Sequence, residues 1–437
     1  MNHRLLRAEQ TTVYPRLGIA IIVGLLILSP FVSAYLSYLA FAICLYRMVR
    51  YDAKVFATDY CILLPLTGLF RTTGGMSLLV WLCLVAGVWY FVRGGLRGDA
   101  TLVLVLSIMC YLLLRMDMNI RKYVLCFGQI FVLYSLLPKQ DVESSVRSAK
   151  VFCWGLALSS LFALVLRDSP QLIAVRGEET VAIWGTNIMR FYGLFEDPNY
   201  YTTLLIIGLA VLCKLKESGR MKGIRFWILG AVLALCGVLT YSKTFFLTLV
   251  LLGGIYILWQ FRDKKMFRGL IFTAMGCLAL VYIVSSSSTL FSVMMERLTS
   301  GSNLSDFTTG RTDLYIAYWN AITENIGSFL FGLGFDAPRL EKDPHNLYLE
   351  IAYHTGFVGL SLVLAFYVSM VYRLKNSVLH VRKQNIIAKY VAIFMIAVLY
   401  MSLHGFFELV TYGGIFVAFL SLNVLKKEDD ILHAQLQ

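Results

Sequence analysis

The sequence predicts an all-α, polytopic membrane protein, and three observations lead to this fold class. First, 58% of the 437 residues are hydrophobic and only 15% are charged, where soluble domains carry roughly 25% charged residues. Second, the mean hydropathy is +0.71. Third, apolar runs recur from one end of the chain to the other. A run that crosses about 30 Å of hydrocarbon must be helical, because lipid offers no partner to a free backbone N–H.

These runs divide the chain into about fourteen predicted spans. Ser29-Pro30 separates the first two, which could instead form one long kinked helix. Several runs of about 12–16 residues are short for a crossing, so about twelve or thirteen spans is the alternative. The spans are, in order, Leu17–Leu28, Phe31–Leu45, Val55–Phe70, Met76–Val92, Ala100–Leu114, Tyr123–Leu137, Val151–Leu166, Tyr200–Cys213, Phe226–Tyr241, Thr244–Phe261, Leu270–Val284, Leu347–Tyr372, Tyr390–Leu403 and Val410–Leu425.

Lysine and arginine gather in alternate connections between these spans, and this alternation predicts the orientation. Cytoplasmic loops carry an excess of both residues, so the basic connections and the N-terminus are assigned to the cytoplasm. The net charge of +13 then reflects topology and attraction to anionic lipid, in preference to nucleic-acid binding. Arg115, Arg121 and Lys122 fall on the other side, against this rule. The basic connections are Arg47/Arg50/Lys54, Lys214/Lys216/Arg220/Lys222/Arg225, Arg262/Lys264/Lys265/Arg268, Arg373/Lys375/Arg382/Lys383 and the tail from Lys426/Lys427.

The opposite, extracytoplasmic face is predicted to carry two long polar loops, residues 167–199 and 285–345. The short turn with Lys243 is expected on the same face. No internal repeat or linker divides the sequence, so residues 1–437 are predicted to form a single integral membrane domain that includes both loops.

The sequence predicts no metal site and no other cofactor. Its nine cysteines lie within or beside apolar runs, without C-x-x-C spacing, and are expected to pack as small apolar side chains. The outer loops contain no cluster of Asp, Glu or His with ligand spacing. His354, inside an apolar run, is expected to be a packing histidine.

The first long loop ends in the sequence RFYGLFEDPN, from Arg190 to Asn199, directly before a predicted span. Asp197 or Asn199 can cap that helix, and Pro198 suits its first turn. Capping explains these three residues without a further function. It does not explain Arg190, whose charge lies beside aromatic residues near the membrane surface, where it pairs with lipid headgroups or with a ligand.

The turn Thr240-Tyr241-Ser242-Lys243 joins two predicted spans with almost no loop. Lys243 could extend its amine outward to water, but the shortness of the turn holds its charge near the membrane. A charge confined in this way is a functional-site hypothesis by default.

The second long loop carries Gly310-Arg311, followed by apolar residues at helical spacing. This spacing predicts an amphipathic helix that lies along the membrane. Its apolar stripe consists of Leu314, Tyr318, Ala321 and Ile322.

The same loop ends in Asp343-Pro344-His345-Asn346, which opens the next span, with Tyr348 and Glu350 in its first turns. A capped helix start explains the Asp and the Asn. Because a cap has no need of a histidine, His345 is a candidate for chemistry.

These motifs, in this order, resemble the O-antigen ligase and polysaccharide polymerase superfamily of bacterial membranes. The resemblance covers residues 190–359 and the span pattern of the whole chain. One difference is Lys243, since the family usually has an arginine there, and lysine lacks the bidentate fork. The matching residues are Arg190 with Gly193 and Asp197-Pro198-Asn199, Ser242-Lys243, Gly310-Arg311 with Trp319, His345-Asn346 with Tyr348 and Glu350, and Gly356 with Gly359.

The resemblance implies an inverting glycosyltransferase of the all-helical C type, with its active site on the outer face of the bacterial cytoplasmic membrane. The donor would be an oligosaccharide on undecaprenyl diphosphate, used without nucleotide sugar, metal or other cofactor. The chemistry agrees, because cleavage of the bond to the diphosphate leaves negative charge that preorganised cations stabilise. Arg190, Lys243 and Arg311 are the candidate diphosphate-binding residues.

A group that titrates near neutrality suits removal of the proton from the attacking sugar hydroxyl. His345 is therefore the candidate general base, and Arg311 is the second catalytic candidate. Glu350 or Tyr348 could orient the histidine, and Asn346 supports the helix start.

The acceptor decides between two enzymes of this family. A polymerase extends a carrier-linked repeat and would work with a flippase and a chain-length regulator, whereas a ligase transfers the finished glycan to lipid A core or to protein. The motif from Arg190 to Asn199 favours a polymerase. A polysaccharide transporter is the alternative from another class, but transporters usually show related halves or broken helices in corresponding positions, which this sequence lacks. A purely structural assembly partner would not explain the ordered cations.

Overall fold

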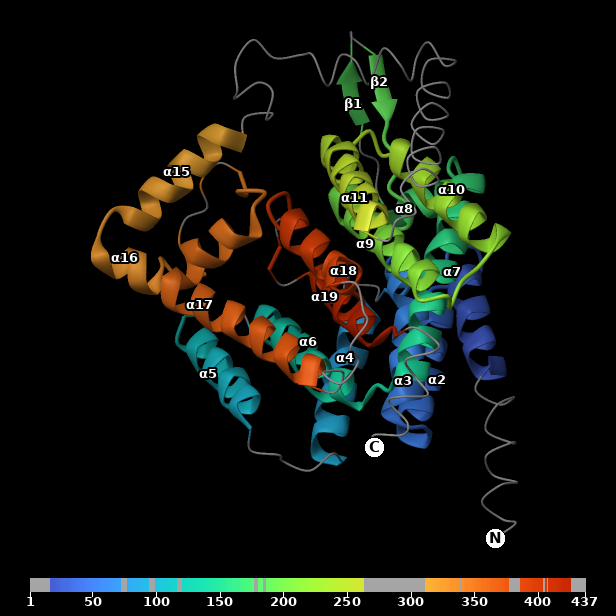
Figure 1. Cartoon of the computed structure of the whole chain (residues 1–437), viewed down its shortest axis with the longest axis horizontal. Helices are drawn as coiled ribbons and strands as arrows, with labels where there is room; N and C mark the ends of the chain where they lie inside the picture. The colour runs from blue at the N-terminus through green and yellow to red at the C-terminus, as the bar shows by residue number, and fades with distance from the viewer. Residues whose placement is uncertain are drawn as a thin grey trace.

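The computed structural model describes residues 16–71, 77–93, 99–115, 120–176, 180–183, 186–262, 311–335, 337, 340, 342–376, 386–403, 405–406 and 408–425. These residues form a helical bundle (Figure 1), which confirms the predicted all-α membrane class. The sequence analysis did not predict one antiparallel hairpin in the first long loop, β1 (Thr180–Ile183) with β2 (Thr186–Met189), where Thr180 pairs with Met189. Gly310, the Leu270–Val284 span and the first part of the second long loop lie outside the described residues.

Every predicted span within the described residues corresponds to an apolar helix. Val142–Val165, Pro198–Glu217 and Leu347–Leu374 are long and apolar enough to cross a membrane, and the other apolar helices are shorter. The helices are Arg16–Leu28, α2 (Tyr35–Arg50), α3 (Ala53–Leu63), α4 (Leu78–Arg93), α5 (Ala100–Arg115), α6 (Ile120–Leu136), α7 (Val142–Val165), α8 (Pro170–Arg176), α9 (Pro198–Glu217), α10 (Ile224–Val238), α11 (Lys243–Arg262), α15 (Arg311–Thr323), α16 (Ile326–Phe331), α17 (Leu347–Asn376), α18 (Ile386–Leu399) and α19 (Leu409–Leu420), with 3-10 turns η1 (Leu64–Leu69), η2 (Leu137–Lys139) and η3 (Ser421–Asn423).

Local chemistry explains where the observed boundaries differ from the predicted ones. The first two spans are separate helices joined by a turn, not one kinked helix, and Ser29 and Ser37 on either side both bond the carbonyl of Leu69. Pro65 lacks the N–H that an α-helix needs, so α3 continues as the 3-10 turn η1. The helix α7 begins well before Val151 because the Asp141 carboxylate accepts the Ser144 N–H at 2.7 Å and caps it.

Contacts between distant connections group them at two ends of the bundle, and the assignment of one end to the cytoplasm stays a prediction. At one end, which we call the inner end, Lys54 pairs with Asp141, and Arg220 donates to the carbonyl of Leu425. At the other, which we call the outer end, the described parts of the two long loops meet turns between spans, as Arg190 does at Thr240 and Phe335 at Arg115. No described ion pair or loop hydrogen bond joins a predicted inner connection to an outer one.

The helix α9 lies at the centre of the bundle and positions the site. It packs against α7, α10, α11, α18 and α19. Most of the residues of α9 are buried inside the bundle. Its first residues, Pro198 and Asn199, therefore emerge in the middle of the outer end.

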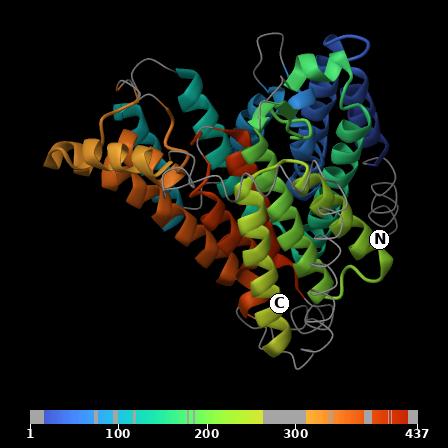
Figure 2. The ribbon, with the colours of Figure 1, turned by 90° about the horizontal axis from the view of Figure 1, so that it is seen from above.

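A break in α17 supports an arm made of α15 and α16, which extends from one side of the bundle in both views (Figures 1 and 2). Gly356 has φ +64°, and a Cβ there would lie 2.3 Å from the carbonyl oxygen of Leu330. The chain after α16 satisfies carbonyls at the break, since Leu333 N donates to Tyr353 at 2.8 Å and Gly334 N to His354 at 3.0 Å.

This packing changes the predicted role of the amphipathic stripe. Tyr318 and Ile322 of α15 are buried against Ala352 and Tyr353 of α17, so the stripe faces protein and not the membrane. The helix was predicted correctly, but its apolar face was assigned to the wrong partner. His354 is a packing histidine as expected, since its Nδ1 lies 2.8 Å from the Gly334 carbonyl and its ring stacks on Phe335.

Candidate active site

The loop before α9 fixes Arg190 at the C-terminal end of α10. The Arg190 side chain is buried, and its Nε donates to the carbonyl of Thr240 at 3.0 Å. The neighbouring N–H of Phe191 donates to the carbonyl of Leu239 at 3.1 Å. The last carbonyls of a helix lack partners within it and form the negative end of its dipole. The end of α10 therefore holds a guanidinium.

The start of α9 is capped as the sequence predicted. The Asp197 carboxylate accepts the N–H groups of Asn199 at 2.5 Å and Tyr200 at 3.4 Å, and Pro198 occupies the first turn. Gly193 has φ +61°, and a Cβ there would come within 2.7 Å of the Tyr201 ring, so this loop conformation requires glycine.

The turn before α11 joins the same group. Ser242 is buried, and its Oγ lies 3.5 Å from Oδ1 of Asn199. Lys243 is half-buried and is the first residue of α11. The acceptor of the Arg190 bond, Thr240, is three residues earlier in the same turn. The structure thus brings Arg190 and Lys243 to one region of the outer end.

Arg311 is half-buried at the first position of α15, on the arm. Burial lowers the pKa of its guanidinium from the ordinary value, Tyr315 and Asp197 oppose this effect, and the charge of Arg190 adds to it. An arginine stays protonated despite such a shift. These interactions put Arg311 within electrostatic range of Arg190, although the two lie on separate elements.

His345 precedes α17 in an unusual backbone conformation. Its φ is +46°, in the left-handed region that costs a non-glycine residue about 1–3 kcal/mol. The next residue, Asn346, caps α17 by accepting the N–H groups of Tyr348 at 3.1 Å and Leu349 at 3.3 Å. Asn346 therefore caps the helix, and His345 is the residue in the strained backbone conformation.

Tyr348 contacts the last turn of α18, and Glu350 holds the segment that joins α18 to α19. The Glu350 carboxylate accepts the N–H of Gly405 at 2.7 Å and of Phe406 at 3.3 Å. The Tyr348 hydroxyl donates to the carbonyl of Ala397 at 2.8 Å. None of these bonds reaches His345, and the orienting role of the two residues stays a prediction.

Three residues at this end were not among the sequence candidates. Arg71 pairs with Glu196 at 2.5 Å and donates to the carbonyl of Val175 at 2.9 Å. Glu408 lies directly before α19, and burial, followed by the charge of Glu196, raises the pKa of its carboxyl while Arg71 opposes the rise. Tyr315 contacts the start of α17. The only sequence signal for Tyr315 was its position one helical turn after Arg311.

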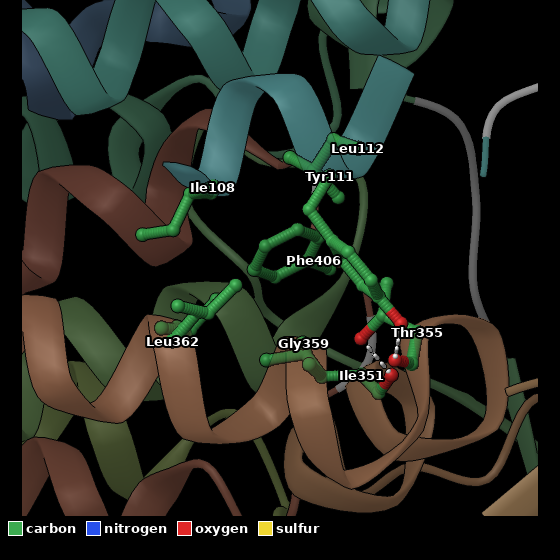
Figure 3. A pocket seen from close by; sticks show the side chains of 9 residues that line it. Ile108, Tyr111, Leu112, Ile351, Thr355, Gly359, Leu362 and Phe406 are labelled. Carbon is green, nitrogen blue, oxygen red and sulfur yellow. Dashed lines mark hydrogen bonds between the residues drawn. The ribbon is translucent and has the colours of Figure 1, made fainter. Parts of the chain in front are cut away.

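An apolar pocket lies between α5, α17 and Phe406 (Figure 3). At its rim, the Tyr111 hydroxyl donates to the carbonyl of Thr355 at 2.7 Å. Its lining, which includes Ile108, Ile351 and Leu362, has no charged side chain. The pocket itself therefore offers no charged group to a phosphate.

The outer end thus offers two guanidinium groups, an ammonium group and an imidazole from four elements. Such a set can bind a diphosphate and accept a proton. Among the described residues, no group of three or more His, Cys, Asp or Glu is arranged to hold a metal ion.

Residues 228–364 match the sequence model of the O-antigen ligase family. A relative from Acinetobacter baylyi, named ComP-specific O-oligosaccharyltransferase, is 27% identical over 200 residues, covering 41% of this chain and 35% of the relative. The match thus spans about a third of that protein's length. No solved structure matches the chain.

The match over residues 228–364 supports the resemblance to the O-antigen ligase family that the motifs predicted. The matched region includes Lys243, Arg311 and His345. The family and the relative support glycan transfer by a ligase-type enzyme.

Proposed function

We propose that this protein transfers a glycan from an undecaprenyl-diphosphate-linked oligosaccharide to a sugar hydroxyl, at the outer face of the bacterial cytoplasmic membrane. The observation that carries this proposal is a chain of contacts: Arg190 lies within electrostatic range of Arg311, and Tyr315, one turn after Arg311, contacts the carbonyl of His345. Arg190 and Arg311 bind the diphosphate, since guanidinium groups bind phosphate oxygens bidentately. Lys243 adds a point charge.

In the proposed reaction, the acceptor hydroxyl attacks the anomeric carbon while its proton passes to His345. The bond from that carbon to the diphosphate oxygen breaks, and direct displacement inverts the configuration. The cations stabilise the charge that develops on the leaving diphosphate. Asn346 supports His345 by fixing the start of α17, and Glu350 and Tyr348 support the same helix through the 397–406 segment.

We propose that the acceptor is a carrier-linked glycan, so that the enzyme is a polymerase working with a flippase and a chain-length regulator. The support is the form of the motif from Arg190 to Asn199. A second candidate is a ligase that transfers the finished glycan to lipid A core or to protein, and the name of the relative favours it. A transporter is less well supported, because the cations lie at one end of the bundle and not midway along it.

Deletion of the gene separates the two acceptors. Loss of a polymerase leaves single repeat units attached to the surface, whereas loss of a ligase leaves long glycan on the lipid carrier. Purified protein should transfer glycan from the polyprenyl-diphosphate donor at an unchanged rate after addition of a chelator. Loss of transfer that magnesium or manganese restores would contradict the metal-independent mechanism.

The orientation is tested by cysteine labelling of intact cells with an impermeant reagent. We expect labelling of an Arg311→Cys variant at the outer end and none of Arg220→Cys at the inner end. The reverse pattern would place the site in the cytoplasm and exclude the proposed donor side.

A further inference from the structure

The hydroxyl of Tyr315 joins the arm to two other elements of the site. It donates to the main-chain carbonyl of Met401 at 2.9 Å, and the carbonyl of His345 lies 3.3 Å from the same oxygen. Burial raises the pKa of the phenol, and the Asn346 side chain lies close enough to oppose that larger rise. One half-buried side chain on α15 therefore connects the helix that begins at Arg311 with the start of α17 and with the chain after α18.

The His345 backbone depends on such support. A left-handed conformation at a non-glycine residue persists only where the surrounding structure over-determines it. On one side, Asn346 fixes the first turn of α17. On the other, Tyr315 contacts the His345 carbonyl itself. Loss of the phenol hydroxyl would remove the link between the His345 backbone and the helix that carries Arg311.

We propose that Tyr315 is a positioning residue that sets the placement of the His345 imidazole relative to Arg311. In this arrangement, the diphosphate bound by the arginine and the hydroxyl activated by the histidine meet at reacting distance. The proposal rests on the glycan-transfer function proposed above. Tyr315 acts through the backbone of His345 and does not itself touch the substrate.

The first test is Tyr315→Phe, which removes the hydroxyl and keeps the ring. Misplacement of a reacting group by about 1 Å can lower a rate by about 10²-fold. We expect turnover to fall about 10- to 100-fold, with the Kd of the polyprenyl-diphosphate donor changed by less than about 3-fold. The matched control is Tyr318→Phe on the same helix, whose hydroxyl donates to the carbonyl of Lys342 at 3.1 Å. Its turnover should stay near that of the wild type.

The second test asks whether Tyr315 acts through the histidine. In a His345→Ala background, Tyr315→Phe should cause no further loss of turnover, because the group that it positions is gone. A merely structural role would lower turnover by the same factor in both backgrounds. That multiplicative result would overturn the proposal.

The third test needs no turnover. Diethyl pyrocarbonate modifies accessible imidazoles, and mass spectrometry can follow the rate at His345. We expect a rate change of several-fold in Tyr315→Phe and none in Tyr318→Phe. Equal turnover and equal modification rates in the two variants would refute the positioning role. If the wild type fails to use the polyprenyl-diphosphate donor but the modification rate still depends on Tyr315, the proposed function fails and the link between Tyr315 and His345 stands.

Discussion

The two ends of the bundle hold buried arginines in different ways. At the inner end, Arg47 makes two hydrogen bonds to the carboxylate of Asp59, at 2.8 and 2.9 Å, and both side chains are buried. At the outer end, the Nε of Arg190 donates to the main-chain carbonyl of Thr240. The inner contact is a bidentate ion pair between two helices, whereas the outer contact ties a guanidinium to the last carbonyls of one helix.

The difference indicates two uses of the same side chain. The inner pair joins α2 to α3 and leaves no net charge for a ligand to bind. The outer arginine is anchored at the end of α10, within electrostatic range of Arg311. If this comparison is correct, changes at the outer end should alter transfer and donor affinity, and changes at the inner end should alter stability.

The largest expected effect is that of His345→Ala on turnover. Removal of a general base lowers the rate by about 10²–10⁴-fold, while the diphosphate site remains, so the donor Kd should be unchanged. Single-turnover kinetics and equilibrium donor binding would measure the two quantities separately. Wild-type turnover at normal membrane abundance would show that His345 is only a helix-start residue.

At the inner end, Asp59→Ala should lower the free energy of unfolding by about 3–5 kcal/mol, because it leaves the buried Arg47 charge without its partner. Denaturant or thermal unfolding in detergent would measure this. The double variant Arg47→Met/Asp59→Leu removes both charges and should recover most of the loss. A normal stability for Asp59→Ala would mean that the pair does not hold α2 and α3 together.

Arg311→Ala tests the outer cations directly. A hydrogen bond to a charged group contributes about 1.5–3 kcal/mol, so donor affinity should fall by about 10- to 150-fold, and transfer should be abolished at low donor concentration. Arg311→Lys should recover affinity only in part, because lysine lacks the bidentate fork. The matched control is Arg373→Ala, which removes a guanidinium near Asp99 at the inner end. Equal donor affinities for Arg311→Ala and Arg373→Ala would remove Arg311 from the donor site.

The smallest effect is expected at the exposed inner pair of Lys54 and Asp141. Burial raises the pKa of Asp141, but Lys54 and the bonds from Ser144 outweigh it and lower the pKa to about 2. The stabilisation is therefore present above the unfolded carboxyl's pKa, about 3.9, and is lost as pH falls through about 2. Because both side chains are about half exposed, Lys54→Ala should cost at most about 1 kcal/mol at neutral pH. A double-mutant cycle with Asp141→Asn would measure the coupling energy between the two side chains. A coupling energy above about 1 kcal/mol would contradict the contrast between this exposed pair and the buried pair of Arg47 and Asp59.

The sequence by itself determined the helical membrane fold, the order of the spans and the caps of two helices. Span positions follow from local hydrophobicity, because lipid forces an apolar run to satisfy its own backbone. The caps at Asp197 and Asn346 are equally local, since each side chain bonds N–H groups two or three residues ahead. The family motifs also named Arg190, Lys243, Arg311 and His345 as candidates.

Only the tertiary structure decided how these candidates meet. Arg190 bonds a carbonyl fifty residues away, and Tyr315 reaches the carbonyl of Met401 across eighty-six residues, so no local pattern could reveal either contact. The break at Gly356 likewise turned the apolar stripe of α15 toward α17, although the same stripe would suit a membrane surface. Hydrophobic periodicity shows which face of a helix is buried, but the partner that buries it depends on packing between distant segments.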